Sequence, residues 1–182
     1  MYQIDTLINF STNETAFLKP CIEEVAAFSK QIIVSVCDHF FDGIEENKEL
    51  LKKIYAQFPN CQFIQYEFQT KKNLYGSHSA CFWHNLGRLL GFYHVAAEID
   101  YLLFLDVDEI VEAKKFEHWL KDFPLGDFAA LRLACYWYFR EEIYQANYWE
   151  DTPLLAKKKV LNHDILMNAL ERAGSYSQIY GK

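Results

Sequence analysis

Glycine, proline and basic residues are all scarce in this sequence. Only 7 Gly and 4 Pro occur among 182 residues, which excludes long flexible linkers and collagen-like repeats. Lys and Arg number 18 against 25 Asp and Glu, so the formal net charge is −7. This balance disfavours a nucleic-acid-binding protein, which normally carries a basic face. An anionic substrate would need a bound cation or a local dipole to reverse the sign at its site.

The sequence also lacks a paired-cysteine pattern and a long apolar segment. Its 5 cysteines are odd in number and include no CxxC pair, so we predict reduced core thiols and a cytoplasmic protein. The longest apolar stretch, Tyr101 to Leu105, is too short to span a bilayer, and no secretory signal opens the chain. We therefore expect no transmembrane segment, while peripheral contact with a membrane stays open.

Apolar and aromatic residues are abundant, at 51% and 17% of the chain, and the length predicts a single domain over residues 1–182. Short apolar runs alternate with segments of helical period as far as residue 126. The runs predicted as strands are Leu7–Phe10, Ile32–Cys37, Gln62–Phe68 and Tyr101–Leu105, and the predicted helices are 18–29, 44–57, 82–98 and 113–121. This order predicts an α/β fold with a mostly parallel central sheet and helices on both faces.

The βα rhythm is lost after residue 126. Phe128 to Tyr138 has an extended, aromatic pattern, residues 154–161 favour a strand, and residues 165–172 favour a final helix. Parallel sheets of this kind bind ligands at the carboxyl ends of their strands. Functional residues are therefore expected immediately after the strands.

Two carboxylates, Asp106 and Asp108, directly follow the most apolar strand. In an extended chain side chains at i and i+2 point the same way, and two close carboxylates repel unless a cation or proton lies between them. A hard divalent ion, Mg²⁺ or Mn²⁺, with open positions for phosphate oxygens would suit this pair. The alternative is a solvated acidic turn after a strand.

Polar residues follow two other predicted strands. Asp38 ends the strand Ile32–Cys37, where its carboxylate could accept hydrogen bonds from a base N–H or from ribose hydroxyls. Asn13 and Glu14 lie just beyond the first strand. Taken alone, Asp38 is equally explained as a helix cap or turn residue, and the Asn13-Glu14 pair as a helix start.

In their order and spacing these motifs resemble the nucleotide-sugar glycosyltransferases of the family 2 type, which have the GT-A fold. The resemblance covers about residues 5 to 112 and includes a loose match to an "RNxG" helix, in which His84 replaces the usual Arg. The matching segments are Asn13-Glu14-Thr15, Ile32–Asp38, Asp42-Gly43, Asn85-Leu86-Gly87-Arg88 and Tyr101–Asp108.

The resemblance implies a metal-dependent transferase that moves a sugar from a nucleotide-sugar donor to a hydroxyl of a saccharide or lipid-linked acceptor, in cell-surface polysaccharide synthesis. It implies a donor half in residues 1–112 and an acceptor-side half in 113–182, short enough that we expect a minimal or truncated transferase. It assigns the metal to Asp106 and Asp108, and donor binding to Asn13, Glu14, Asp38, Arg88 and Asp106. The loop Asp38-His39-Phe40-Phe41-Asp42-Gly43 departs from the family by lacking a "GST" segment.

A catalytic base is the least defined part of the resemblance. Inverting members use an Asp or Glu, often in an "ED" pair, and Glu150-Asp151 matches that pair. Trp149 and Tyr148 could supply the apolar wall that raises the pKa of a general base. The alternative is that Glu150 and Asp151 cap a turn before Pro153.

Two other functions remain open at this stage. A phosphohydrolase of the haloacid dehalogenase type also has DxD after an apolar strand, but here the motif comes late and no downstream acidic pair follows a Lys. A non-catalytic nucleotide-sugar-binding module would keep the fold without the reaction. His84 falls in a predicted helix, where packing or surface exposure is the more common role for a histidine.

Overall fold

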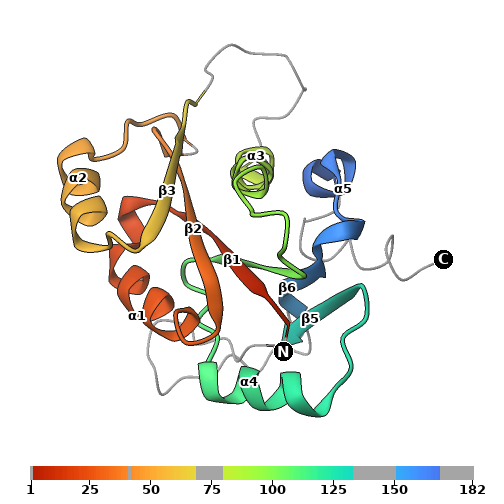
Figure 1. Ribbon diagram of the computed structural model, residues 1–182. Helices are drawn as coiled ribbons and strands as arrows, with labels where there is room; N and C mark the ends of the chain where they lie inside the picture. Colours follow the sequence, from red (N-terminus) through yellow and green to blue (C-terminus); the bar gives the residue numbers. More distant parts are fainter. Residues whose placement is uncertain (1, 41, 69–79, 133–150, 169–182) are drawn as a thin grey trace, which may run out of the picture.

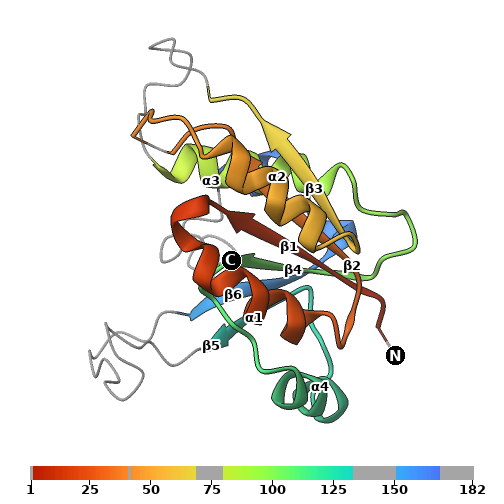
Figure 2. The same ribbon diagram turned by 90° about the vertical axis from the view of Figure 1, so that its left-hand side faces the viewer.

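The computed structural model describes residues 2–40, 42–68, 80–132 and 151–168. Within these residues a six-stranded sheet has the order β3-β2-β1-β4-β6-β5, with helices packed against it (Figures 1 and 2). The predicted α/β fold with a mostly parallel sheet is confirmed.

Four neighbouring strands are parallel. They are β1 (Ile4–Phe10), β2 (Ser29–Cys37), β3 (Cys61–Tyr66) and β4 (Tyr101–Asp106). β1 lies between β2 and β4, and its register sets Asn9 opposite Asp106. The chain therefore builds the sheet outward from β1 in one direction through β3 and then returns to the other side of β1 with β4.

The remaining two strands are antiparallel. β6 (Asp151–Lys157) pairs with β4, and β5 (Phe128–Arg132) pairs with β6 at the sheet edge. The predicted strand over 154–161 instead gives way to a 3₁₀ turn, η2 (Lys158–Val160), followed by α5 (His163–Asn168). The loss of βα rhythm after residue 126 thus coincides with the change to antiparallel pairing.

Helices cover both faces of the sheet, as predicted. α1 (Thr15–Val25), α2 (Lys48–Gln57) and α4 (Ala113–Asp122) lie on one face, and α3 (Ala80–Phe92) and α5 lie on the other (Figures 1 and 2). Alternate residues of β4 enter the two cores: Leu103 and Leu105 pack with α1, while Leu102 and Phe104 pack with α3. Both cores depend on β4, so the strand that precedes Asp106 is rigidly held.

Two helices are shorter than their periodicity predicted. The helix expected over 44–57 begins at Lys48, where the Asn47 side chain accepts a hydrogen bond from the Leu50 N–H at 3.0 Å and Ile44 is left 63% exposed. The helix expected over 82–98 ends at Phe92. Beyond it, backbone carbonyls of the following turn accept from the Lys158 Nζ, a tertiary contact that no local pattern encodes.

Two findings bear on the expected environment of the protein. In the described part of the chain, no helix is long and apolar enough to cross a membrane. Cys21, Cys37 and Cys61 are free thiols, and Cys81 and Cys135 have no described side chain.

Candidate active site

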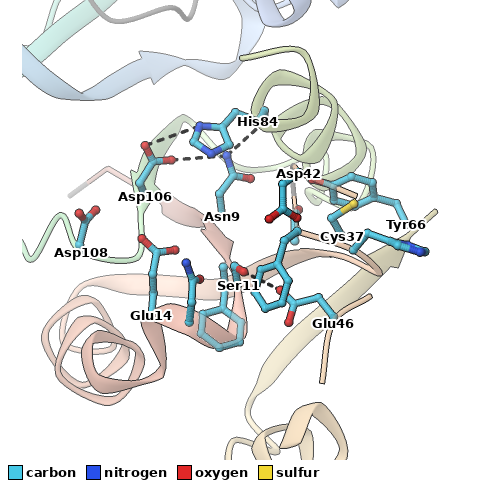
Figure 3. Close-up of a pocket in the computed structure, with 15 residues that line it drawn as sticks. Asn9, Ser11, Glu14, Cys37, Asp42, Glu46, Tyr66, His84, Asp106 and Asp108 are labelled. Atoms are coloured by element: carbon cyan, nitrogen blue, oxygen red, sulfur yellow. Dashed lines mark hydrogen bonds and ion pairs between the residues drawn. The ribbon is translucent and has the colours of Figure 1, made fainter. Parts of the chain in front are cut away.

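A pocket of ≈600 Å³ lies at the carboxyl edge of the parallel strands. It is lined by Asn9 and Ser11 at the end of β1, Cys37 at the end of β2, Tyr66 at the end of β3 and Asp106 at the end of β4 (Figure 3). Because β2 and β4 flank β1 on opposite sides, this edge is the topological switch point at which open α/β sheets bind ligands.

The charge of this pocket is strongly negative. Five of its lining residues are acidic, namely Glu14, Asp42, Glu46, Asp106 and Asp108, whereas its only basic lining residues among those described are His39 and His84. In Figure 3 Glu14, Asp106 and Asp108 lie toward one end and Asp42 and Glu46 toward the other. A phosphorylated ligand in this pocket therefore needs a cation to offset the carboxylates.

The two aspartates reach the pocket through a turn. β4 ends at Asp106, whose N–H donates to the Glu109 Oε2 at 2.8 Å, while the Glu109 N–H donates back to the Asp106 carbonyl at 2.8 Å. Val107 is fully buried and its N–H donates to the Asn9 carbonyl at 3.1 Å, which leaves Asp108 exposed. Both carboxylates line one pocket. A turn closed by Glu109 brings them there, whereas the sequence argument assumed an extended chain.

The Asp106 carboxylate is held in a fixed position. Its Oδ1 accepts from the Arg88 Nη2 at 2.9 Å and from the Asn9 Nδ2 at 3.5 Å, and its Oδ2 lies 4.0 Å from the His84 Nδ1. Arg88 and Asp106 form a buried ion pair, since each side chain is only 9% exposed. Arg88 does not line the pocket. Its guanidinium group instead pairs with the Asp106 carboxylate and neutralises it.

Side chains from three strands fix α3 against the pocket. The Asn9 Nδ2, the Ser35 Oγ and the Tyr66 hydroxyl each donate to a backbone carbonyl of α3. These carbonyls belong to His84 (3.1 Å), Gly87 (2.7 Å) and Trp83 (2.9 Å). Burial raises the pKa of the Tyr66 phenol, so this hydroxyl stays protonated and remains a donor.

Asp38 lies beside the pocket rather than in its lining. Its Oδ1 accepts from the Phe68 N–H at 2.7 Å and lies 2.7 Å from the His39 Nδ1. Burial would raise the pKa of Asp38, but the hydrogen bonds from His39 and Phe68 outweigh it and the pKa lies below its ordinary value. The ionised carboxylate thus orients His39, which does line the pocket.

The structure brings together four of the residues singled out from the sequence. Asn13 and Glu14, on the 3₁₀ turn η1 (Thr12–Glu14), share the pocket with Asp106 and Asp108. The proposed base pair is not among them. Glu150 lies outside the described residues, and Asp151 opens β6 without a described side chain.

Sequence reasoning missed other lining residues, among them Asn9, Ser11 and Glu46. His84, expected in a packing or surface role, also lines the pocket. Asn9 carried a usable signal, because a polar residue near the end of a buried strand is unusual. Glu46 carried none, because it follows Glu45 in a polar loop and only the fold distinguishes the two.

The donor set fits a hard divalent cation. Asp106, Asp108 and Glu14 lie toward one end of the pocket (Figure 3). No group of three or more His, Cys, Asp or Glu with metal-binding geometry occurs among the described residues. Magnesium sites commonly use only one or two carboxylates and complete their shell with water and substrate phosphates, so these residues fit a site that the substrate completes.

Comparisons with known proteins find similarity in structure alone. No protein-family model and no curated protein sequence matches the chain. Rv0371c from Mycobacterium tuberculosis aligns with 100% of this chain and 83% of its own, at a TM-score of 0.58 and 10% identity. The 4-diphosphocytidyl-2C-methyl-D-erythritol synthase from Anaerococcus prevotii aligns with 95% of this chain and 86% of its own, at a TM-score of 0.51 and 10% identity.

Glycosyltransferases are also among the similar structures. The mannosyltransferase PcManGT from Pyrobaculum calidifontis, solved in complex with GDP-Man and Mn²⁺, aligns with 73% of this chain and 37% of its own, at a TM-score of 0.46 and 8% identity. This last similarity is too distant to support a function. The similarity to Rv0371c and to the Anaerococcus prevotii synthase shows that this chain shares their α/β fold.

Proposed function

We propose that this protein is a glycosyltransferase that binds a nucleotide-sugar and a divalent cation in the pocket between β1 and β4. The observation that carries the proposal is that Glu14, Asp106 and Asp108 line one pocket at the switch point of the sheet, and that this pocket is lined by no Lys or Arg among the described residues. Carboxylates that line a ligand-binding edge at a topological switch point are suited to a cation that carries phosphate.

Asp106 and Asp108 would hold Mn²⁺ or Mg²⁺, with Asp108, the exposed member, as the more direct ligand. When bound, the cation would neutralise the negative charge on the nucleoside diphosphate leaving group. Asn13, Glu14 and the loop after Asp38 would contact the nucleoside. The ion pair with Arg88 holds the Asp106 carboxylate in place at the pocket.

An acceptor hydroxyl, on a glycan or glycolipid, would attack the anomeric carbon of the bound sugar. Deprotonation of this hydroxyl by Asp151 or Glu150 would give an inverting reaction. Asp151→Asn and Glu150→Gln, each made alone, should identify the base: the variant that lacks it should lose turnover of the nucleotide-sugar while keeping its affinity for the nucleotide.

Thermal unfolding in the presence of sugar nucleotides tests donor binding. A nucleotide at one hundred times its Kd should stabilise the protein by about 2.7 kcal/mol, or about 5–10 °C in a chain of this size. The stabilisation should require MnCl₂. Asp108→Asn should abolish it, whereas Asp122→Asn, the same change at an exposed carboxylate of α4, should respond like the parent. If no sugar nucleotide raises the midpoint, or if Asp108→Asn responds fully, the proposed donor site is wrong.

Product analysis then separates the reactions open to this fold. Release of a nucleoside diphosphate from a sugar nucleotide, increased by a saccharide acceptor, would support glycosyl transfer. Release of pyrophosphate from a nucleoside triphosphate and a sugar phosphate would show nucleotidyl transfer instead. Magnesium-dependent turnover of a generic phosphomonoester would favour the phosphohydrolase, and tight nucleotide binding without any turnover would favour a binding module.

A further inference from the structure

A single buried carboxylate joins two loops that border the pocket. Glu46, in the connection between β2 and α2, is 4% exposed. Its Oε1 accepts from the Ser11 hydroxyl at 2.5 Å and from the Thr12 N–H at 3.1 Å, and its Oε2 accepts from the Thr12 hydroxyl. Ser11 and Thr12 begin the connection between β1 and α1, so the carboxylate spans two segments that are distant in the sequence (Figure 3).

The backbone of Glu46 is anchored as well. Its N–H donates to the Asp38 carbonyl at 2.9 Å, at the point where β2 has just ended. Glu46 therefore links the residue that follows β2 to the residues that follow β1. Residues close to each end of this link also line the pocket: Asn13 and Glu14 in one loop, and His39 in the other.

The neighbours of Glu46 show that its burial is specific. Glu45 and Glu49 have side chains that are 65% and 76% exposed, and each forms an exposed ion pair with a lysine. In the described part of the chain Glu46 has no such ion pair, and its side chain accepts hydrogen bonds from hydroxyl and amide donors. Burying a carboxylate costs free energy unless hydrogen bonds replace its lost hydration. The fold therefore keeps Glu46 buried at a desolvation cost that its hydrogen bonds offset.

We infer that Glu46 is a positioning residue for nucleoside binding. It holds Ser11 and Thr12 against the carboxyl end of β2 and so sets the spacing between the two loops that would contact the nucleoside. This role rests on the proposed function, because it assigns a use to the same pocket. Glu46 acts through Thr12 and Ser11 on their neighbours Asn13 and Glu14. A hydrogen-bond acceptor of full charge and correct length is required, since three donors converge on one carboxylate.

The test compares Glu46→Gln with Glu49→Gln, the same substitution at an exposed carboxylate of α2. Titration calorimetry with UDP and with GDP, each in MnCl₂, gives the nucleotide Kd at a temperature where circular dichroism shows both variants folded. Glu46→Gln should weaken binding at least tenfold, and Glu49→Gln should match the parent. Thr12→Val, which removes one donor from the other loop, should weaken binding in the same way, and the double variant should be little worse than Glu46→Gln alone.

Two further measurements separate positioning from simple stabilisation. In turnover assays Glu46→Gln should raise KM for the nucleotide-sugar while kcat stays within about twofold of the parent. Amide hydrogen exchange without nucleotide should show lost protection at residues 11–14 in Glu46→Gln and unchanged protection in β4.

The outcomes are distinct. If Glu46→Gln melts at a lower temperature but keeps the parent Kd and KM, Glu46 only stabilises the fold and the positioning role is refuted. If amide hydrogen exchange at residues 11–14 is the same in Glu46→Gln as in the parent, the positioning role is also refuted, whatever the nucleotide affinity of the variant. If the parent itself binds no nucleotide, the proposed function fails, and with it the use assigned to Glu46, although lost protection would still show the link between the loops.

Discussion

Replacing Gly87 with alanine should destabilise the protein even though it improves helix propensity. A Cβ at this position of α3 would lie 2.7 Å from the Asn9 Oδ1 and 3.0 Å from the Tyr66 hydroxyl, so the helix approaches the sheet as closely as a glycine permits. Asn9 cannot move freely, because its Nδ2 donates to the His84 carbonyl at 3.1 Å.

Three contributions set the size of the effect. Alanine gains about 1 kcal/mol over glycine inside a helix. Overpacking at a rigid contact costs about 1–3 kcal/mol, and displacing Asn9 forfeits a hydrogen bond worth about 1 kcal/mol. The free energy of unfolding should therefore fall by about 2 kcal/mol, which lowers the melting temperature by about 4–8 °C in a chain of this size.

Urea and thermal unfolding measure this change directly. Gly126→Ala is the matched control, because the atom nearest to its added Cβ is the Phe128 carbonyl oxygen at 3.8 Å, an ordinary contact. That variant should be as stable as the parent or slightly more so, since it restricts the unfolded chain. A Gly87→Ala protein as stable as Gly126→Ala would show that α3 is not held against β1 in the way described.

Two further predictions concern buried charge. Arg88→Met removes the cation from the buried pair with Asp106 and should lower the free energy of unfolding by about 3 kcal/mol. Lys30→Met breaks an exposed ion pair and should leave the urea midpoint unchanged. Equal losses of unfolding free energy in the two variants would refute the argument. Asp5 is fully buried, its Oδ2 has no hydrogen-bond partner in the described structure, and burial raises its pKa despite the opposing Gln31 N–H. A folded-state pKa above the unfolded one costs stability as pH rises, so Asp5→Asn should raise the urea midpoint more at pH 7 than at pH 4; a larger gain at pH 4 would contradict this.

The fold could be predicted largely because its signals are local. The continuous apolar run before Asp106 indicates a strand buried on both faces, and β4 does contribute to two cores. Helix ends were predicted less well, because capping and tertiary contacts decide them. The Asn47 cap starts α2 after Ile44, although the apolar period extended through that residue.

The candidate site was predictable where a residue directly follows a strand. Asp106 is the last residue of β4, Asp108, Asn13 and Glu14 lie beyond strand ends, and all four share the pocket. The environment of Arg88, which lies in a helix, could not be predicted in this way. The motif placed it near the donor, and the structure pairs it with Asp106, a contact that forms only when α3 packs against β4.

The alternation of strands and helices and the carboxylates near strand ends can be read from short segments, and the acidic balance from composition. The environment of each carboxylate depends on which distant segments pack around it. Glu45 and Glu46 are adjacent and chemically identical, yet one is exposed and ion-paired and the other is buried against Ser11 and Thr12. A carboxylate is tolerated in the interior only where donors converge on it, and here those donors come from a segment about 35 residues away in the chain.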